Sequence, residues 1–145
     1  MASGNRIFLD SNVVLDHVAD RQPFSEYAHR LFALAETGEL ALFVSALSFS
    51  NLYYVLRKLR GHSDALFLLR KLEQLISVTT VGESEVQAAF PSSFKDFEDA
   101  LQYFSAKAVG GIDAIVTRNE SDFESSEIPV YSPEAFLTSR EKREK

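Results

Sequence analysis

The sequence predicts an α/β fold in which a mostly parallel central sheet of four to five strands is packed between two layers of helices, a three-layer α/β/α sandwich. Two observations lead to this prediction. Short apolar runs alternate along the chain with longer segments whose apolar residues recur at helical spacing. The chain has 145 residues, of which 46% are hydrophobic and 25% charged, as in an ordinary globular domain. We therefore predict a single domain over residues 1–138.

The first half of the chain contains two predicted strands and four predicted helices. Pro23 is suited to the first turn of a helix, and Gly38 and Gly61 are suited to end one. In chain order the elements are a strand at Arg6–Leu9, a helix at Ser11–Ala19, a helix from Pro23 to near Gly38, a strand at Leu40–Val44, and helices at Ala46–Arg60 and Ser63–Ile76.

The second half continues the alternation. Pro91 and the pair Gly110 and Gly111 each end a helix. In chain order the elements are a strand at Ser77–Val81, a helix at Glu83–Phe90, a helix at Asp96–Val109, a strand at Ile112–Thr117, a short edge strand at Ile128–Tyr131 and a last helical turn at Pro133–Leu137. The tail 139–145 is composed almost entirely of charged residues, and we expect it to be disordered.

The composition excludes several classes of protein. The chain has no cysteine, so it has neither a disulfide framework nor a thiolate metal site. No apolar run approaches the roughly 20 residues that span a bilayer, and the first residues do not form a secretory signal. We therefore expect a cytoplasmic protein. The formal net charge of −6 argues against binding nucleic acid by bulk positive charge, although a metal ion bound by acids reverses the charge locally.

Asp10 is the first candidate functional residue, and it directly follows the first predicted strand. In a parallel sheet the functional crevice lies beyond the carboxyl ends of the strands, so an acid at this place is a candidate ligand. Ser11 and Asn12 follow it and would line the same crevice. The alternative is structural, since each of these three residue types can cap the helix that begins here. Asp16, farther along that helix, is expected to be a solvated helix residue with a structural role.

Asp96 and Asp99 form the second candidate group. Positions three apart lie on one face of a helix, so the two carboxylates point the same way and can hold one hard cation such as Mg²⁺. The structural alternative is that Asp96 caps the helix while Asp99 interacts favourably with the helix dipole.

Polar residues after the last long strand form the third group. Thr117, Asn119 and Asp122 lie beside Asp10 if the first and fourth strands are neighbours. Their alternative role is an ordinary polar loop. Asn51 lies on a helix face that can look into the same crevice, where an amide can hold water or phosphate. The three histidines lie on separate segments without a repeated ligand spacing, and we expect surface or packing roles for them.

Four motifs occur in order along the chain. They are Leu9-Asp-Ser-Asn-Val-Val-Leu-Asp16, Val44-Ser-Ala-Leu-Ser-Phe49, Asp96-Phe-Glu-Asp-Ala-Leu-Gln102 and Ile115-Val-Thr-Arg-Asn-Glu-Ser-Asp-Phe123. As an ordered set they resemble the PIN-domain family over essentially the whole chain, and the last motif is the most specific match.

The resemblance implies a parallel sheet between helices and an acidic Mg²⁺ or Mn²⁺ site. It also implies endoribonuclease activity selective for single-stranded RNA, commonly in the VapC-type toxin of a toxin–antitoxin pair, and homodimers. Asp10 matches the first acid of the family and Asp99 the third, with Asp96 beside it. These three are the catalytic and metal-binding residues that the resemblance predicts.

The sequence departs from the family pattern at two positions. Asn51 stands where the family usually has glutamate, and Asn119 stands where many members have the fourth acid, with Asp122 as a possible substitute. A catalytically degenerate PIN fold that binds nucleic acid or protein is therefore the alternative to a ribonuclease. A haloacid-dehalogenase phosphatase also begins with a strand ending in aspartate, but that class resembles Asp-x-Asp and position 12 here is asparagine.

The two helices between Ala46 and Ile76 carry more large apolar side chains than one buried face of each helix uses. The surplus predicts a two-fold homodimer interface. The residues are Phe49, Leu52, Tyr53, Tyr54, Leu56, Leu66, Phe67 and Leu69.

Overall fold

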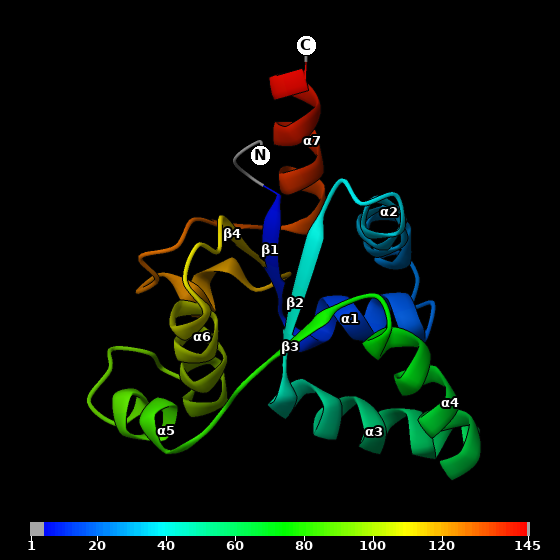
Figure 1. Cartoon of the computed structure of the whole chain (residues 1–145), viewed down its shortest axis with the longest axis horizontal. Helices are drawn as coiled ribbons and strands as arrows, with labels where there is room; N and C mark the ends of the chain where they lie inside the picture. The colour runs from blue at the N-terminus through cyan, green and yellow to red at the C-terminus, as the bar shows by residue number, and fades with distance from the viewer. Residues whose placement is uncertain (1–4, 145) are drawn as a thin grey trace.

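The computed structural model describes residues 5–144, and its strands form one sheet in which every neighbouring pair is parallel (Figure 1). The strand order is β3-β2-β1-β4-β5. The strands are β1 Arg6–Leu9, β2 Ala41–Ser45, β3 Ser77–Thr79, β4 Ala114–Val116 and β5 Val130–Tyr131. The predicted parallel α/β sheet is thus confirmed, and it is built from all five predicted strands, with several ends shortened by one or two residues.

Helices cover both faces of the sheet. They are α1 Ser11–Val18, α2 Ser25–Glu36, α3 Ala46–Arg60, α4 His62–Glu73, α5 Glu83–Ala89, α6 Phe97–Val109 and α7 Pro133–Glu144, with a 3₁₀ helix η1 at Glu120–Phe123. α1 to α4 lie on one side of the sheet, and α5 and α6 lie on the other (Figure 1). The three-layer sandwich is confirmed.

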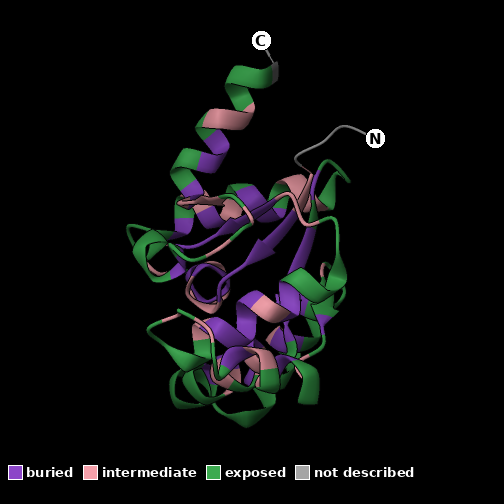
Figure 2. Ribbon diagram, turned by 90° about the vertical axis from the view of Figure 1, so that its left-hand side faces the viewer, coloured by how far each residue is buried: buried purple, intermediate pink, exposed green. Residues whose placement is uncertain are grey.

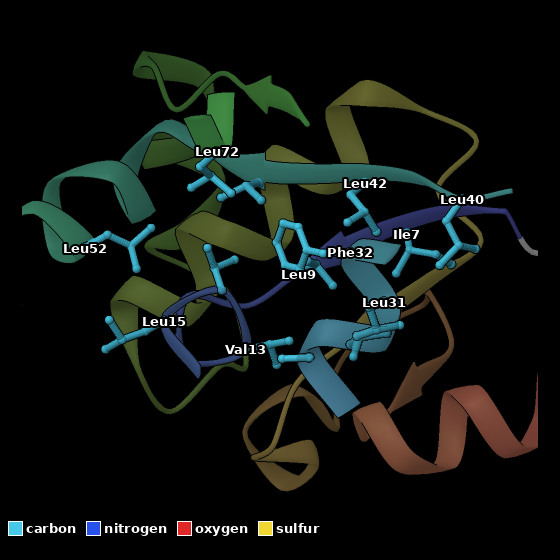
Figure 3. Packing of buried hydrophobic residues seen from close by; sticks show 14 of the residues in the cluster. Ile7, Leu9, Val13, Leu15, Leu31, Phe32, Leu40, Leu42, Leu52 and Leu72 are labelled. Atoms are coloured by element: carbon cyan, nitrogen blue, oxygen red, sulfur yellow. The ribbon is translucent and has the colours of Figure 1, made fainter. Parts of the chain in front are cut away.

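Side-chain alternation along β1 explains this arrangement. Ile7 and Leu9 face the cluster formed with α1 to α4 and α7, whereas Phe8 between them faces Tyr103 and Ala106 of α6. Figure 3 shows Ile7 and Leu9 packed near α2 in the larger cluster, and Figure 2 shows the strands buried at the centre of the molecule. A strand buried on both faces is held firmly, so the position of its carboxyl end is well defined.

Several predicted helix boundaries are corrected by the structure. α4 ends at Glu73, three residues before the predicted end at Ile76. α2 begins at Ser25, so Pro23 precedes the helix and does not occupy its first turn. α6 begins at Phe97, because Asp96 has extended backbone angles and serves as the N-cap. These shifts leave the predicted order of elements unchanged.

The prediction of a disordered tail is wrong through Glu144, because α7 continues to that residue. Ion pairs with α2 and with the turn that follows it account for the difference: Arg30 Nη2 lies 2.6 Å from Glu141 Oε1, and Arg140 Nη2 lies 3.4 Å from Glu39 Oε1. Lys145 and residues 1–4 of the predicted domain lie outside the described residues. Within residues 5–144 no helix is long and apolar enough to cross a membrane.

Candidate active site

Polar side chains collect at the carboxyl edge of the otherwise apolar sheet. Asp10 follows β1, Thr117 follows β4, and Ser45 and Thr79 end β2 and β3; all four are buried. The chain passes from β1 to β2 on one side of the sheet, while β4 lies on the other side of β1. Asp10 and Thr117 therefore lie at the point where the strand order reverses, which is the usual position of a ligand crevice in an open parallel sheet.

The Asp10 carboxylate is held by two side chains from different elements. Thr117 Oγ1 donates a hydrogen bond of 2.7 Å to Oδ2, and Gln102 Nε2 of α6 donates one of 3.3 Å to Oδ1. The side chain forms no capping bond to α1, so the structural alternative for Asp10 is not realised. Burial raises the pKa of Asp10 above its usual value, against the lowering effect of the hydrogen bonds from Thr117 and Gln102.

Asp99 lies in the first turn of α6 and shares the site with acids that are distant in sequence. Burial and then the negative charges of Asp10, Asp96 and Asp122 raise the pKa of Asp99 to about 7. Asp96 also acts as the N-cap, since its Oδ1 accepts the Asp99 backbone N–H at 3.0 Å. The interpretation of Asp96 as a helix cap is thus confirmed, and its charge also acts on Asp99.

Glu98 is a member of this cluster that the sequence reasoning did not select. Asn51 Nδ2 of α3 donates a hydrogen bond of 2.8 Å to Glu98 Oε1. Burial and the charges of Asp96 and Asp10 raise the pKa of Glu98. A carboxylate therefore lies directly beside Asn51, the position where the resemblance led us to expect a glutamate. The feature of the sequence that could have indicated Glu98 is its position between Asp96 and Asp99.

The loop after β4 contributes one acid and one backbone contact. The charge of Asp122, in η1, raises the pKa values of both Asp10 and Asp99. Asn119 contributes its backbone N–H, which donates to Thr117 Oγ1 at 3.0 Å. Asp122 is therefore an acid of this loop whose charge reaches the cluster.

Two amide oxygens in this region are buried without a hydrogen-bond partner among the described residues, Asn12 Oδ1 and Gln102 Oε1. Gln102 itself is only 1% exposed, and the sequence reasoning missed it because a glutamine in an amphipathic helix gives no distinctive signal. Ser11, which the sequence also predicted to line this crevice, forms a hydroxyl hydrogen bond with Ser48 of α3. A buried acceptor without a donor is costly, and a bound water molecule is the usual donor in such a position.

The fit of a metal ion can be tested on these residues. Within residues 5–144 no three histidine, aspartate or glutamate side chains already form a compact ligand cage. Mg²⁺ does not require one, because it is usually held by one or two carboxylates and keeps several waters. In the described part of the chain no lysine or arginine forms an ion pair with Asp10, Asp96, Glu98, Asp99 or Asp122. The two unpartnered amide oxygens can accept hydrogen bonds from water. The site fits a hydrated hard cation.

Asp16 has a structural role, but it is buried and not a solvated helix residue as the sequence led us to expect. It is 1% exposed and accepts from Arg21 at 2.9 Å and from Arg118 at 2.7 Å. Arg118 also lies over the ring of Phe24, 3.8 Å from its centroid. Asp16 thereby ties the loop that follows β4 to α1 and to the turn before α2, and so supports the position of Thr117.

Comparison with known protein families matches residues 6–121 to the PIN domain. The chain belongs to the PIN domain family. A relative of this PIN domain, Ribonuclease VapC1 of Aquifex aeolicus, is 27% identical to it over 139 residues, covering 92% of this chain and 94% of the relative.

Solved structures share the fold of this PIN domain at low sequence identity. The DNA-bound VapBC of Salmonella typhimurium superimposes with a TM-score of 0.65 at 16% identity, covering 88% of this chain and 98% of the other. The Mycobacterium tuberculosis toxin VapC20, described as cleaving the sarcin-ricin loop, gives a TM-score of 0.59 at 19% identity, covering 75% of this chain and 86% of the other.

Proposed function

We propose that this PIN domain is a divalent-metal-dependent endoribonuclease that hydrolyses phosphodiester bonds of single-stranded or structured RNA. The observation that carries the proposal is that Thr117, after β4, and Gln102 of α6 both hydrogen-bond to Asp10, which brings Asp10 together with the acids at the start of α6. Acids that repel one another without neighbouring basic partners are suited to a divalent cation. The ribonuclease name of the Aquifex aeolicus relative supports RNA as the substrate.

Asp10, Asp96 and Asp99 would hold Mg²⁺ or Mn²⁺ and form the catalytic centre. The bound ion would supply activation of the attacking water and neutralisation of charge on the scissile phosphate. Thr117 and Gln102 orient the Asp10 carboxylate toward this task through their hydrogen bonds. The surrounding residues Ser11, Asn12, Asn51, Asn119 and Asp122 would line the site.

The positions of Glu98 and Asp122 support the ribonuclease over the degenerate binding module. Asn51 and Asn119 favour the module, because each replaces an acid expected from the family. The structure puts the Glu98 carboxylate 2.8 Å from the amide nitrogen of Asn51, and the charge of Asp122 acts on Asp10 and Asp99. Carboxylates are therefore available near both positions, which favours catalysis.

The names of the structural neighbours suggest a cellular role for this chain. The structural neighbours include VapBC complexes and a toxin–antitoxin complex of Klebsiella pneumoniae. We propose that this chain is likewise the toxin of a toxin–antitoxin pair, acts in the cytoplasm as a single domain that includes α7, and binds an antitoxin protein.

The test is cleavage of end-labelled single-stranded RNA in Mn²⁺ or Mg²⁺, with EDTA as the metal-free condition. Asp10→Asn should reduce the rate at least about 100-fold, since even outer partners of metal ligands change activity by about 10- to 100-fold. Asp64→Asn is the matched control, because Asp64 lies on α4 in an exposed pair with Arg60. Equal activity of the two variants, or cleavage in EDTA, contradicts the proposal; metal-dependent RNA binding without cleavage supports the degenerate module.

We also propose that the chain forms a homodimer through α3 and α4. Tyr54, Leu66 and Phe67 are 59%, 49% and 62% exposed, as the apolar surplus predicted. Leu52, Leu56 and Leu69 form the buried face of these helices in the domain's own core, so the exposed residues are the surplus.

Light scattering at tens of micromolar should give the mass of a dimer for the wild type and a shift toward monomer for Phe67→Asp. Phe90→Asp is the control, because Phe90 is 74% exposed but lies after α5, on the other side of the sheet. A wild type that is monomeric at this concentration, or equal effects of the two substitutions, contradicts the α3–α4 interface.

A further inference from the structure

Two histidines that are separate in sequence meet on the surface between α1 and α2. His17 Nδ1 and His29 Nδ1 are 2.7 Å apart, and the two rings are inclined by 75°. Asp20 Oδ1 lies 2.8 Å from His29 Nε2. Phe32 stacks on the His17 ring with a centroid separation of 4.0 Å and an interplanar angle of 4°. This group, called here the histidine pair, has no role in the acidic site.

The hydrogen bonds determine where the protons of the histidine pair lie. The Asp20 carboxylate can only accept, so His29 carries its proton on Nε2, and its Nδ1 in the neutral ring has a free lone pair. In the pair of neutral rings, His17 therefore donates its Nδ1 proton to His29 Nδ1. Burial lowers the pKa of His17 to about 4, so this ring is neutral at neutral pH. The result is one proton held between two imidazole nitrogens.

We infer that the position between the two Nδ1 atoms is a binding site for a borderline divalent transition metal, with Zn²⁺ as the representative ion. Neutral imidazole is a preferred ligand of this class, whereas Mg²⁺ prefers oxygen. When the metal binds, the His17 proton moves from Nδ1 to Nε2, so both Nδ1 lone pairs become available and no proton is released. Asp20 keeps the His29 Nε2 proton, the carboxylate–histidine–metal arrangement that orients many metal-binding imidazoles.

The required adjustment is small. Zn–N bonds of about 2.0–2.1 Å with tetrahedral angles separate two nitrogens by about 3.3 Å, so the pair must open by roughly 0.6 Å. The His29 and Asp20 side chains are 42% and 69% exposed and can move outward together. No third histidine, aspartate or glutamate among the described residues joins the pair as a ligand, so water would complete the coordination. The site is separate from the acidic cluster, because Asp10 precedes α1 and His17 lies in its last turn, about 10 Å along the helix axis at 1.5 Å per residue.

The experiment is calorimetric titration of the whole protein with Zn²⁺ in excess Mg²⁺, which occupies oxygen ligands. We expect one Zn²⁺ per chain in the wild type and in Asp99→Asn, no binding at this site in His29→Gln, and affinity about 10-fold or more lower in Asp20→Asn. His62→Gln is the control and should bind as the wild type, since His62 pairs with Tyr53 elsewhere. Nitrogen-detected imidazole spectra should show both Nδ1 resonances shifting with Zn²⁺.

The outcomes separate this inference from the proposed nuclease. Equal Zn²⁺ affinity of His29→Gln and the wild type, or Nδ1 resonances that do not respond, overturns the histidine site. Loss of Zn²⁺ binding in Asp99→Asn also overturns it, because the ion would then occupy the acidic cluster. Circular dichroism and melting of His29→Gln verify that the variant is folded. The Zn²⁺ affinity of Asp20→Asn tests the site independently, because Asp20 is exposed and is not itself a proposed ligand.

Discussion

Asp99→Asn is expected to raise the melting temperature of the metal-free protein at pH 7 by a few degrees and to abolish most of its stabilisation by Mn²⁺. The substitution removes one negative charge from a half-buried group that Asp10, Asp96 and Asp122 repel. It also removes a proposed metal ligand. A ligand that binds only the native state stabilises it by RT ln(1 + [L]/Kd), so loss of the ligand group removes that gain. RNA cleavage should be lost with it.

The pH dependence has a defined sign. The pKa of Asp99 is raised from 3.8 to about 7, so the native state holds this proton more tightly than the unfolded state. The cost of ionising Asp99 is absent below about pH 4, grows as pH rises toward 7, and is constant above that value. The stability difference between Asp99→Asn and the wild type should grow over this interval without metal and shrink when Mn²⁺ is present.

Thermal melts from pH 4 to 8, with EDTA and with Mn²⁺, measure both effects. Asp64→Asn serves again as the control, because it makes the same change at an exposed position on α4. A lower metal-free melting temperature for Asp99→Asn, together with an intact Mn²⁺ response, would show that Asp99 acts only as a first-turn helix residue and would refute its assignment as a ligand.

Asp16→Ala is expected to lower the free energy of unfolding by about 3 kcal/mol. Removing one member of a buried ion pair typically costs about 3–5 kcal/mol, and the partial exposure of Arg21 and Arg118 places this case at the lower end. The loop carrying Thr117 loses its tie to α1, so RNA cleavage should decrease as well.

Urea denaturation measures the stability loss. Glu141→Ala is the matched control, since Glu141 forms an exposed ion pair with Arg30 and such pairs contribute about 0–1 kcal/mol. If Asp16→Ala costs no more than Glu141→Ala, Asp16 does not hold the loop and α1 together.

Part of the site was predictable because parallel strands place their carboxyl ends at one edge of the sheet. That rule alone put Asp10 and Thr117 together once β1 and β4 were neighbours, and Leu9 and Val116 are indeed register partners. Asp99 was predictable from helix periodicity, which sets its face relative to Asp96. The metal-binding role of these acids stays a proposal, which the Asp99→Asn experiment tests.

The sequence by itself determined the order of strands and helices, because apolar periodicity is a local property that burial imposes on each element. Only the tertiary structure decided which side chains from different elements meet. The contact of Asn51 with Glu98, the support of Asp10 by Gln102, and the pairing of His17 with His29 depend on helix packing and side-chain rotamers. The last helix was misjudged for the same reason: its charged sequence is stabilised by partners on and beside α2 that no local pattern reveals.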